Sequence, residues 1–268
     1  MDLSTAVNVV LLGIVEGLTE FLPVSSTGHL LLADALLDWE GPAGKVFEIV
    51  IQLGAILAVC WLYRERLLRA AFGMFGGGEE FRFALNVALA VVPALIVGAL
   101  LHDFIKGVLF NPWVVAVTLI LGGIAIIYIE RNAPRPRVRE IEAMSPALAL
   151  GIGCCQVISI IPGVSRAGAT IMGAMLLGTE RRVATEFSFF LAIPTMVAAT
   201  AYDVYKSRHD LSFNDAAIIA LGFVVAFVVA LVVVRWFIGY VSRQTFLPFA
   251  WYRIAVGSAA LIWLFVSR

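Results

Sequence analysis

Two glutamates four residues apart lie in an apolar stretch near the N-terminus. At this spacing, Glu16 and Glu20 project from the same face of a helix. Two like charges in apolar surroundings repel each other and are costly to desolvate, so a divalent cation, a shared proton or a nearby arginine has to compensate them. A solvated helix end is the alternative, but carboxylates within membrane segments usually serve a function.

A turn rich in hydroxyl groups follows directly and ends at His29. Pro23 disfavours a continuing helix, and Gly28 permits a tight turn. Hydroxyl groups and free amides gathered in such a turn bind anions, particularly where a second helix opens; the hydroxyl residues are Ser25, Ser26 and Thr27. A plain helix cap is the alternative for the turn. His29 is either a structural histidine or takes part in the chemistry.

A second polar turn covers residues 162–170 and contains Arg166, the only charged residue between 147 and 177. A guanidinium group is always charged and forks naturally onto phosphate oxygens. Ser165 and Thr170 add two hydroxyl donors beside it. A salt bridge from Arg166 to Glu16 or Glu20 is the structural alternative, and it is compatible with phosphate binding.

Four other polar residues in the apolar segments are candidates for a surrounding layer that orients the site. They are Glu48, Gln52, Gln156 and Glu186. Carboxylates that merely sit at a membrane interface are the alternative interpretation for Glu48 and Glu186.

The composition indicates that this chain folds in a lipid bilayer. Of its 268 residues, 61% are hydrophobic and only 14% are charged, whereas a soluble domain is about one quarter charged. The formal net charge is zero, so nothing suggests a nucleic-acid partner. Six apolar stretches approach the roughly 20 residues that a spanning helix needs. They lie at about 46–63, 82–101, 113–130, 185–204, 215–238 and 247–266.

Two further apolar stretches, about 6–32 and 147–177, contain the two polar turns. Non-helical backbone at membrane depth survives only where protein buries it or a wet cavity receives it. We therefore predict two re-entrant helix–turn–helix hairpins. The fold class is an all-α polytopic membrane protein with six transmembrane helices and these two hairpins.

The two hairpins resemble each other at an offset of about 140 residues, which predicts an inverted repeat. The matching pairs are Gly13 with Gly153, Glu16 with Gln156, Ser25 with Ser165, and Gly28 with Gly168. One membrane domain, 1–268, then consists of repeat one at about 1–131 and repeat two at about 145–268. Each repeat holds one hairpin and three spans.

The arginines and lysines predict the orientation. Most of them lie in four connections, 64–82, 131–146, 178–184 and 235–246, which we place on the cytoplasmic side. Both termini then lie outside, and the hairpins enter from opposite faces, so that their tips can meet near the midplane. Arg253 is expected near the inner end of the last span.

These motifs resemble those of the undecaprenyl pyrophosphate phosphatase, or bacitracin-resistance, family. The resemblance rests on residues 16–29 and 162–170, with further matches at 47–54 and 186–189. Ala167 departs from the family, which usually has serine there. The resemblance implies a lipid substrate, undecaprenyl pyrophosphate, whose hydrolysis recycles the carrier for cell-wall synthesis and confers bacitracin resistance. It also implies a divalent cation, Mg²⁺ or Ca²⁺, and a periplasmic active site in the bacterial inner membrane.

The expected mechanism has Ser26 as nucleophile, with His29 or a glutamate as proton acceptor. Attack by water with Glu20 as base stays open, as does a metal-binding role for Glu16 and Glu20. The expected phosphate contacts are Arg166, Ser165, Thr170, Ser25 and Thr27.

The main rival is a flippase or transporter of a polyprenyl phosphate, since inverted repeats with broken helices are transporter architecture. A lipid phosphatase with a histidine nucleophile is disfavoured, because no histidine follows Arg166 before His209. A homodimer is one expectation for the oligomeric state.

Overall fold

The computed structural model describes residues 2–37, 39, 46–206 and 216–267. The first half of the chain forms α1 (Leu3–Thr19), α2 (Ser26–Leu37), α3 (Val46–Leu62), α4 (Arg64–Gly73), α5 (Gly78–Phe104) and α6 (Pro112–Asn132). The second half forms α7 (Pro146–Gln156), α8 (Arg166–Leu176), α9 (Arg181–Lys206), α10 (Ala216–Val241) and α11 (Leu247–Val266). A π-helical turn at Ile105–Leu109 and 3-10 turns at Ile141–Ala143 and Val157–Ile160 complete the described elements.

Five helices of the described chain are long and apolar enough to cross a membrane, and a bent pair supplies a sixth candidate. The five lie within α5, α6, α9, α10 and α11. The pair is α3 with α4, which meet at an angle of 79°. These six candidates coincide with the six predicted spans, so the prediction of an all-α polytopic membrane protein is confirmed. The connection predicted at 64–82 differs, because α4 and the first turn of α5 occupy much of it.

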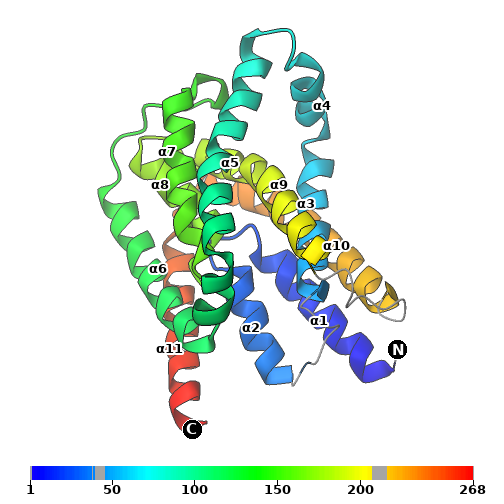
Figure 1. The fold of residues 1–268 in the computed structure, drawn as a ribbon. Helices are drawn as coiled ribbons and strands as arrows, with labels where there is room; N and C mark the ends of the chain where they lie inside the picture. The colour runs from blue at the N-terminus through cyan, green and yellow to red at the C-terminus, as the bar shows by residue number, and fades with distance from the viewer. Residues whose placement is uncertain (1, 38, 40–45, 207–215, 268) are drawn as a thin grey trace.

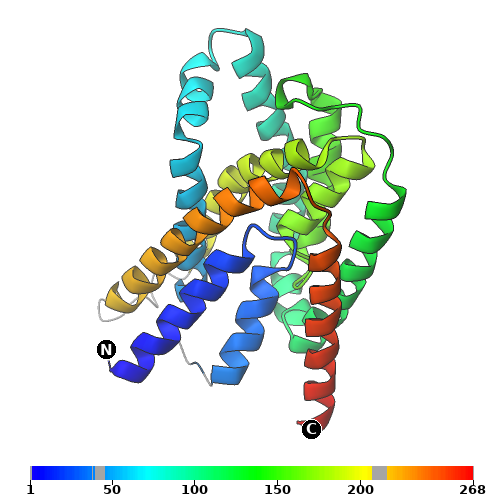
Figure 2. The ribbon, with the colours of Figure 1, turned by 180° about the vertical axis from the view of Figure 1, so that it is seen from behind.

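Both broken stretches form hairpins. α1 rises from the end of the molecule that holds the two termini, turns at mid-height, and α2 returns to the same end (Figure 1; Figure 2). α7 and α8 form the second hairpin, which enters from the opposite end (Figure 1). The two turns therefore lie inside the molecule, where protein surrounds their backbone.

The hairpins pack on equivalent helices of the opposite halves. α1 packs against α10, whereas α7 packs against α5. The first long helices of the two halves, α3 and α9, contact each other, and so do the last ones, α6 and α11. These paired contacts are symmetric between the two halves, as an inverted repeat predicts. The division into repeats at about 1–131 and 145–268 stays a prediction.

Glycines allow the closest helix contacts, as is usual where helices pack in a membrane. A Cβ atom on Gly54 of α3 would lie 2.4 Å from the carbonyl oxygen of Phe223 on α10. A Cβ atom on Gly153 of α7 would lie 2.3 Å from the carbonyl oxygen of Ala90 on α5. The backbones thus touch where each hairpin or span meets its partner.

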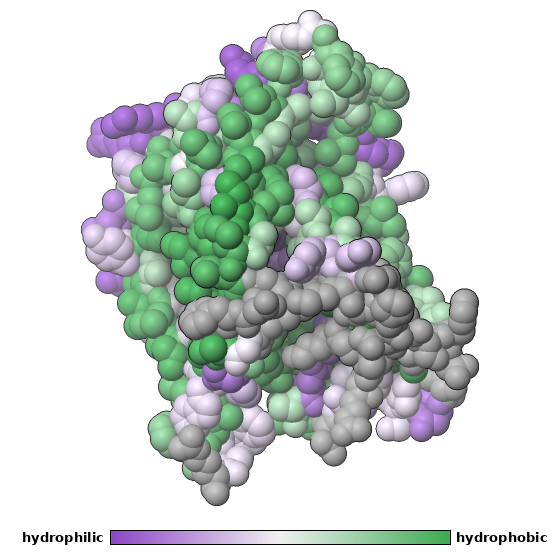
Figure 3. Space-filling model, viewed as in Figure 1, coloured by the Kyte–Doolittle hydropathy of each residue, from purple (hydrophilic) through white to green (hydrophobic). Residues whose placement is uncertain are grey.

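The outer surface is apolar over the body of the molecule. An apolar region covers the upper and left-central part of the face in Figure 3, down to the residues drawn in grey. Large apolar side chains are exposed along the candidate spanning helices, for example Ile96, Leu121 and Val232. Such a surface is stable in contact with lipid chains rather than water.

Candidate active site

The two hairpin turns meet each other and share an unusual backbone conformation. Ser25 and Ser165 have φ angles of 73° and 75°, and among the described residues they are the only non-glycine residues with positive φ. Each serine caps the helix that follows, since its Oγ accepts a hydrogen bond from the amide of Gly28 or of Gly168. A left-handed conformation costs a non-glycine residue about 1–3 kcal/mol, and such strain is typical of functional sites. The predicted match of these residues is thus visible in geometry.

An ion pair joins the two turns. Arg166, the first residue of α8, donates from Nη2 to Oε1 of Glu20 over 3.1 Å. Its Nη1 donates to the carbonyl oxygen of Ser188 on α9 over 3.1 Å. Glu20 and Arg166 are both largely buried, with side chains 6% and 11% exposed. The first turn and the guanidinium group of the second half therefore meet inside the protein, as predicted.

Ser26 opens α2 beside this ion pair. Its hydroxyl donates to Oε2 of Glu20, the carboxylate oxygen that does not contact Arg166. A carboxylate that accepts a serine hydroxyl is placed to take its proton, and a cation on the other oxygen holds that carboxylate in position. Of the two proton acceptors considered from the sequence, a glutamate, Glu20, is the one that contacts Ser26 in this structure.

His29 faces elsewhere. Its Nδ1 lies 2.8 Å from the carbonyl oxygen of Ser25, and its Nε2 lies 2.8 Å from the hydroxyl of Tyr252 on α11. Since a carbonyl only accepts, Nδ1 carries the proton, and in the neutral ring Nε2 accepts from Tyr252. Both ring nitrogens are engaged, so the expectation of His29 as a direct partner of Ser26 does not match this arrangement.

Glu16 lies one helical turn before Glu20 and is fully buried. Within the described part of the chain, neither of its carboxylate oxygens has a hydrogen-bond partner. Burying a carboxylate without hydrogen-bond partners is energetically costly. In the described residues, no group of three or more His, Cys, Asp or Glu side chains is placed to hold a metal ion.

A polar cavity of about 140 Å³ lies at the junction of the two turns. Its polar lining includes Glu20, Ser25, Ser26, Thr27, Gln52, Ser159, Ser165 and Arg166. All the predicted phosphate contacts except Thr170 thus reach one cavity. Gln52 from α3 lines it directly, rather than standing behind it.

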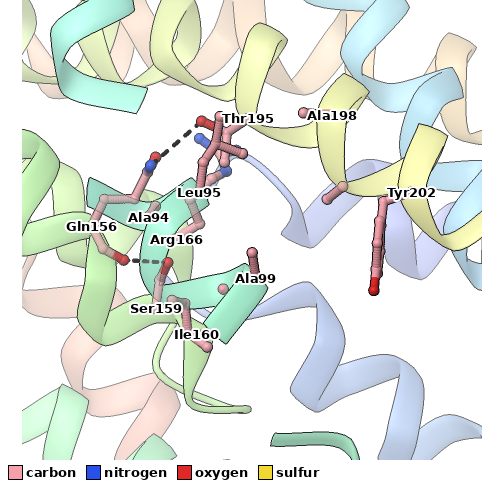
Figure 4. Close-up of a pocket in the computed structure, with 12 residues that line it drawn as sticks. Ala94, Leu95, Ala99, Gln156, Ser159, Ile160, Arg166, Thr195, Ala198 and Tyr202 are labelled. Carbon is pink, nitrogen blue, oxygen red and sulfur yellow. Dashed lines mark hydrogen bonds between the residues drawn. The ribbon is translucent and has the colours of Figure 1, made fainter. Parts of the chain in front are cut away.

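A larger apolar cavity of about 460 Å³ adjoins the polar one, because Ser159 and Arg166 line both. Figure 4 shows Gln156 and Thr195 at its wall, with the Gln156 amide donating to Oγ1 of Thr195 over 3.4 Å. Gln156 is fully buried, so the predicted supporting residue lies beside the site and lines the apolar part.

Thr170 and Glu186, like His29, do not line the polar cavity. Thr170 is fully buried, and its hydroxyl lies 2.6 Å from Oγ of Ser188. Its side chain therefore faces α9 rather than the cavity. It therefore supports the helix that holds Arg166. Glu186 pairs with Arg182 over 3.0 Å in a separate arginine-lined cavity, one turn into α9. Glu48 occupies the first turn of α3, and its supporting role stays a prediction.

From its position in the sequence, Arg253 is expected near the inner end of the last span, without a role in the site. In the structure it is 1% exposed and binds the backbone of both turns. The sequence contained a signal for such a role: Arg253 is the single charged residue in the apolar segment 247–266, as Arg166 is in its own segment. Isolated charges in membrane segments usually have a function. The last span begins at Leu247, so position 253 lies nearly two helical turns inside the helix.

The fold and the site define a multi-pass membrane protein with a buried polar centre that suits phosphate chemistry. Hydroxyl groups, capped helix ends and an arginine line that centre, and an apolar cavity adjoins it. The chain belongs to the bacitracin resistance protein BacA family, whose family model matches residues 9–259.

Named relatives are similar over nearly the whole chain. The sequence is 60% identical over 248 residues to undecaprenyl-diphosphatase 2 of Paramagnetospirillum magneticum, covering 92% of this chain and 95% of that protein. It is 55% identical over 268 residues to undecaprenyl-diphosphatase of Rhizorhabdus wittichii, covering 98% and 99%. It is 52% identical over 264 residues to undecaprenyl-diphosphatase of Sphingopyxis alaskensis, covering 98% of each chain.

Proposed function

We propose that this protein hydrolyses undecaprenyl pyrophosphate to undecaprenyl phosphate and inorganic phosphate. The names of its relatives support this activity. The structural observation that carries it is the chain of contacts from Ser26 to Glu20 to Arg166. A flippase that only binds the headgroup has no need for a serine hydroxyl held against a carboxylate, so transport alone is not favoured.

In the proposed reaction, Oγ of Ser26 attacks the terminal phosphorus of the substrate. Glu20 accepts the hydroxyl proton, and the bond from phosphorus to the bridging oxygen breaks, which releases undecaprenyl phosphate. Glu20 gives this proton to the departing undecaprenyl phosphate. Water then attacks the phosphoserine and gives a proton to Glu20, which passes it to Oγ of Ser26 as the bond from phosphorus to Oγ breaks and inorganic phosphate leaves. Direct attack by water, with Glu20 as base, is the alternative route.

Arg166 and the two capped turns stabilise the charge that develops on the transferred phosphoryl group. The guanidinium group lines the polar cavity together with Ser25, Thr27 and Ser165. Preorganised donors of this kind lower the barrier because they need no reorganisation during the reaction.

The donor set fits a hard divalent cation such as Mg²⁺ or Ca²⁺. Glu16 offers two buried carboxylate oxygens without partners in the described chain, and the polar cavity is lined by further oxygen donors. Mg²⁺ in proteins is commonly held by one or two carboxylates, water and substrate phosphates. Glu16 would hold this cation, which would neutralise phosphate charge. A metal contact from Glu20 would compete with its role as the base for Ser26.

The apolar cavity beside Arg166 suits the first isoprene units of the lipid tail. Its wall is formed mainly by Ala94, Leu95, Ala198 and Ala199, from α5 and α9. A headgroup in the polar cavity would therefore leave its tail in an apolar channel. The rest of the tail then reaches the lipid around the helices.

For cellular placement, we propose the bacterial inner membrane, with the active site and both termini on the periplasmic side. The distribution of arginines supports this orientation. Hydrolysis there returns the lipid carrier to cell-wall synthesis and protects against bacitracin. A homodimer stays a prediction.

A phosphate-release assay on purified protein in detergent tests the proposal. Wild type with Mg²⁺ should release phosphate from undecaprenyl pyrophosphate, and a chelator should abolish the activity. Arg166→Lys keeps the charge but loses the bidentate hydrogen bonding of the guanidinium group. We expect kcat to fall about 30- to 1000-fold, which corresponds to a loss of about 2–4 kcal/mol of transition-state stabilisation. Arg243→Lys, an exposed arginine after α10, is the control and should match wild type. Lipid movement without phosphate release would contradict the proposal.

A further inference from the structure

The guanidinium group of Arg253 on α11 is enclosed by backbone carbonyl oxygens from three separate segments. Nη1 donates to Pro23 over 2.9 Å and to Val164 over 3.0 Å. Nη2 donates to Gly163 over 2.9 Å and to Thr118 over 3.2 Å, and Nε donates to Leu119 over 3.3 Å. An arginine has five N–H donors, and all five are used here.

These contacts connect the two hairpin turns directly. Pro23 lies two residues before Ser25, and Val164 lies immediately before Ser165. Arg253 therefore donates hydrogen bonds to both turns, next to the serines whose backbone has a positive φ angle. The contacts to α6 fix the guanidinium group itself. Strained backbone persists only where the surroundings determine it, and Arg253 supplies such a constraint at both positions.

Arg253 does not line the polar cavity in which the phosphate contacts lie. It lines a second apolar cavity of about 380 Å³, behind the turn of the second hairpin. It therefore acts on the site through the carbonyl groups that it holds, rather than by touching the substrate.

The neighbouring helix leaves space for this arginine. A Cβ atom on Gly122 of α6 would lie 2.0 Å from Nη2 of Arg253 and 2.6 Å from its Cζ. A methyl group at this position would displace the guanidinium group without removing its charge. Gly122 thus offers a way to move Arg253 without mutating it.

We propose that Arg253 is a positioning residue for the reaction: it locks both hairpin turns in one register, so that Ser26 and Glu20 face Arg166. This inference rests on the proposed function. Lysine at position 253 has one nitrogen on a flexible stem and cannot span three backbone segments, so Arg253→Lys should loosen both turns.

The kinetic test compares Arg253→Lys and Gly122→Ala with two matched controls, the exposed Arg243→Lys and Gly239→Ala. A Cβ atom on Gly239 would have no neighbour within 4 Å. We expect kcat to fall about 100-fold in both test variants, as for a small misplacement of catalytic groups. KM should stay within about threefold, because the phosphate contacts remain present. Unchanged kcat, or a rise in KM alone, would overturn the inference.

A second readout does not depend on activity. Hydrogen–deuterium exchange should become faster in the two turns, 20–28 and 160–168, of Arg253→Lys and Gly122→Ala, while α10 keeps its protection. Unchanged exchange in both turns overturns the inference. Failure of wild type to release phosphate contradicts the proposed function instead, so the two failures are distinguishable.

Chemical rescue separates positioning from general damage. Arg253→Ala leaves the space of the guanidinium group empty next to the apolar cavity. Millimolar guanidinium that binds in this space should restore part of kcat, whereas the same concentration of sodium chloride should not. If Arg253→Ala does not yield folded protein, Gly122→Ala still decides the question. A variant whose activity loss equals its loss of folded protein would show a structural role only, and would overturn the inference.

Discussion

Glu20 makes contacts with both halves of the proposed reaction centre. One carboxylate oxygen accepts from Ser26 and the other from Arg166. His29, four residues after Ser25, is held by a carbonyl oxygen and by Tyr252 instead. The two residues that the sequence offered as proton acceptors therefore have different surroundings, which leads to different expectations for their variants.

Glu20→Gln should lower kcat by about 10²- to 10⁴-fold, since an amide cannot accept the proton from Ser26. His29→Gln should lower it much less, because an amide can still make hydrogen bonds to Ser25 and Tyr252. The measurement is initial-rate phosphate release under saturating substrate. An equal or larger loss in His29→Gln would assign the proton to the imidazole.

Ser26→Ala distinguishes the two chemical routes. If Ser26 is the nucleophile, the variant should release no phosphate above background, and no phosphoserine should be trapped by rapid acid quench. A mild loss would favour direct attack by water. Ser159→Ala is the matched control, because Ser159 lines the same cavity but its hydroxyl donates to the Gln156 carbonyl.

Glu16→Gln tests the cation site. Loss of the carboxylate should weaken the apparent affinity for Mg²⁺ by about tenfold or more. Without metal, the variant should unfold at a higher temperature than wild type, because it no longer buries a carboxylate without partners. Mg²⁺ titrations of activity and of thermal unfolding give the two readings. Glu186→Gln, in the separate cavity, is the control. It should change neither the Mg²⁺ dependence of activity nor the Mg²⁺ dependence of the unfolding temperature.

The helices approach one another closely at glycines. Gly54 brings α3 against α10, and Gly153 brings α7 against α5. Because α1 also packs on α10, the position of α10 influences the first turn directly. Small residues at these crossings are thus part of what aligns the site.

Gly54→Ala should destabilise the protein by about 1–3 kcal/mol, the usual cost of overpacking a tight contact. The reason is that its Cβ atom would lie 2.4 Å from the Phe223 carbonyl oxygen, where backbone has to shift. Gly98→Ala in α5 is the control, since its Cβ atom would meet nothing within 4 Å. Thermal unfolding in detergent should show a lower midpoint for the first variant only. Equal midpoints would mean that α3 and α10 are less tightly packed than described.

The molecule as a whole is organised around two ends and a middle. The termini lie at one end, and the connection between α4 and α5 lies at the other (Figure 1). The hairpins enter from opposite ends, so the reaction centre lies between the two faces. The proposed orientation in the membrane rests on the arginine-rich connections, which we predict to lie in the cytoplasm.

Single cysteines test this orientation in a variant without Cys60, Cys154 and Cys155. Leu36, 71% exposed near the end of α2, should react as cysteine with an impermeant maleimide added to intact cells with a permeabilised outer membrane. Phe75, 89% exposed between α4 and α5, should react only after the inner membrane is opened. The reverse pattern would invert the proposed topology and move the carrier site to the cytoplasmic side.

The lengths of the spans and the identity of the two polar turns could be predicted from the sequence. These properties are local, because a spanning helix needs about 20 apolar residues and because an isolated charge in the bilayer is energetically costly. Glu20, Ser26 and Arg166 stood out for this reason, and their meeting could be expected once opposite hairpins were predicted.

The partners of individual side chains were decided only by the tertiary structure. Thr170 contacts Ser188, and Glu186 pairs with Arg182. Arg253 donates hydrogen bonds to backbone carbonyl oxygens of both turns. Each outcome depends on how helices far apart in the chain are rotated and how closely they approach. Periodicity within one segment does not contain that information, since packing between segments fixes rotation and depth.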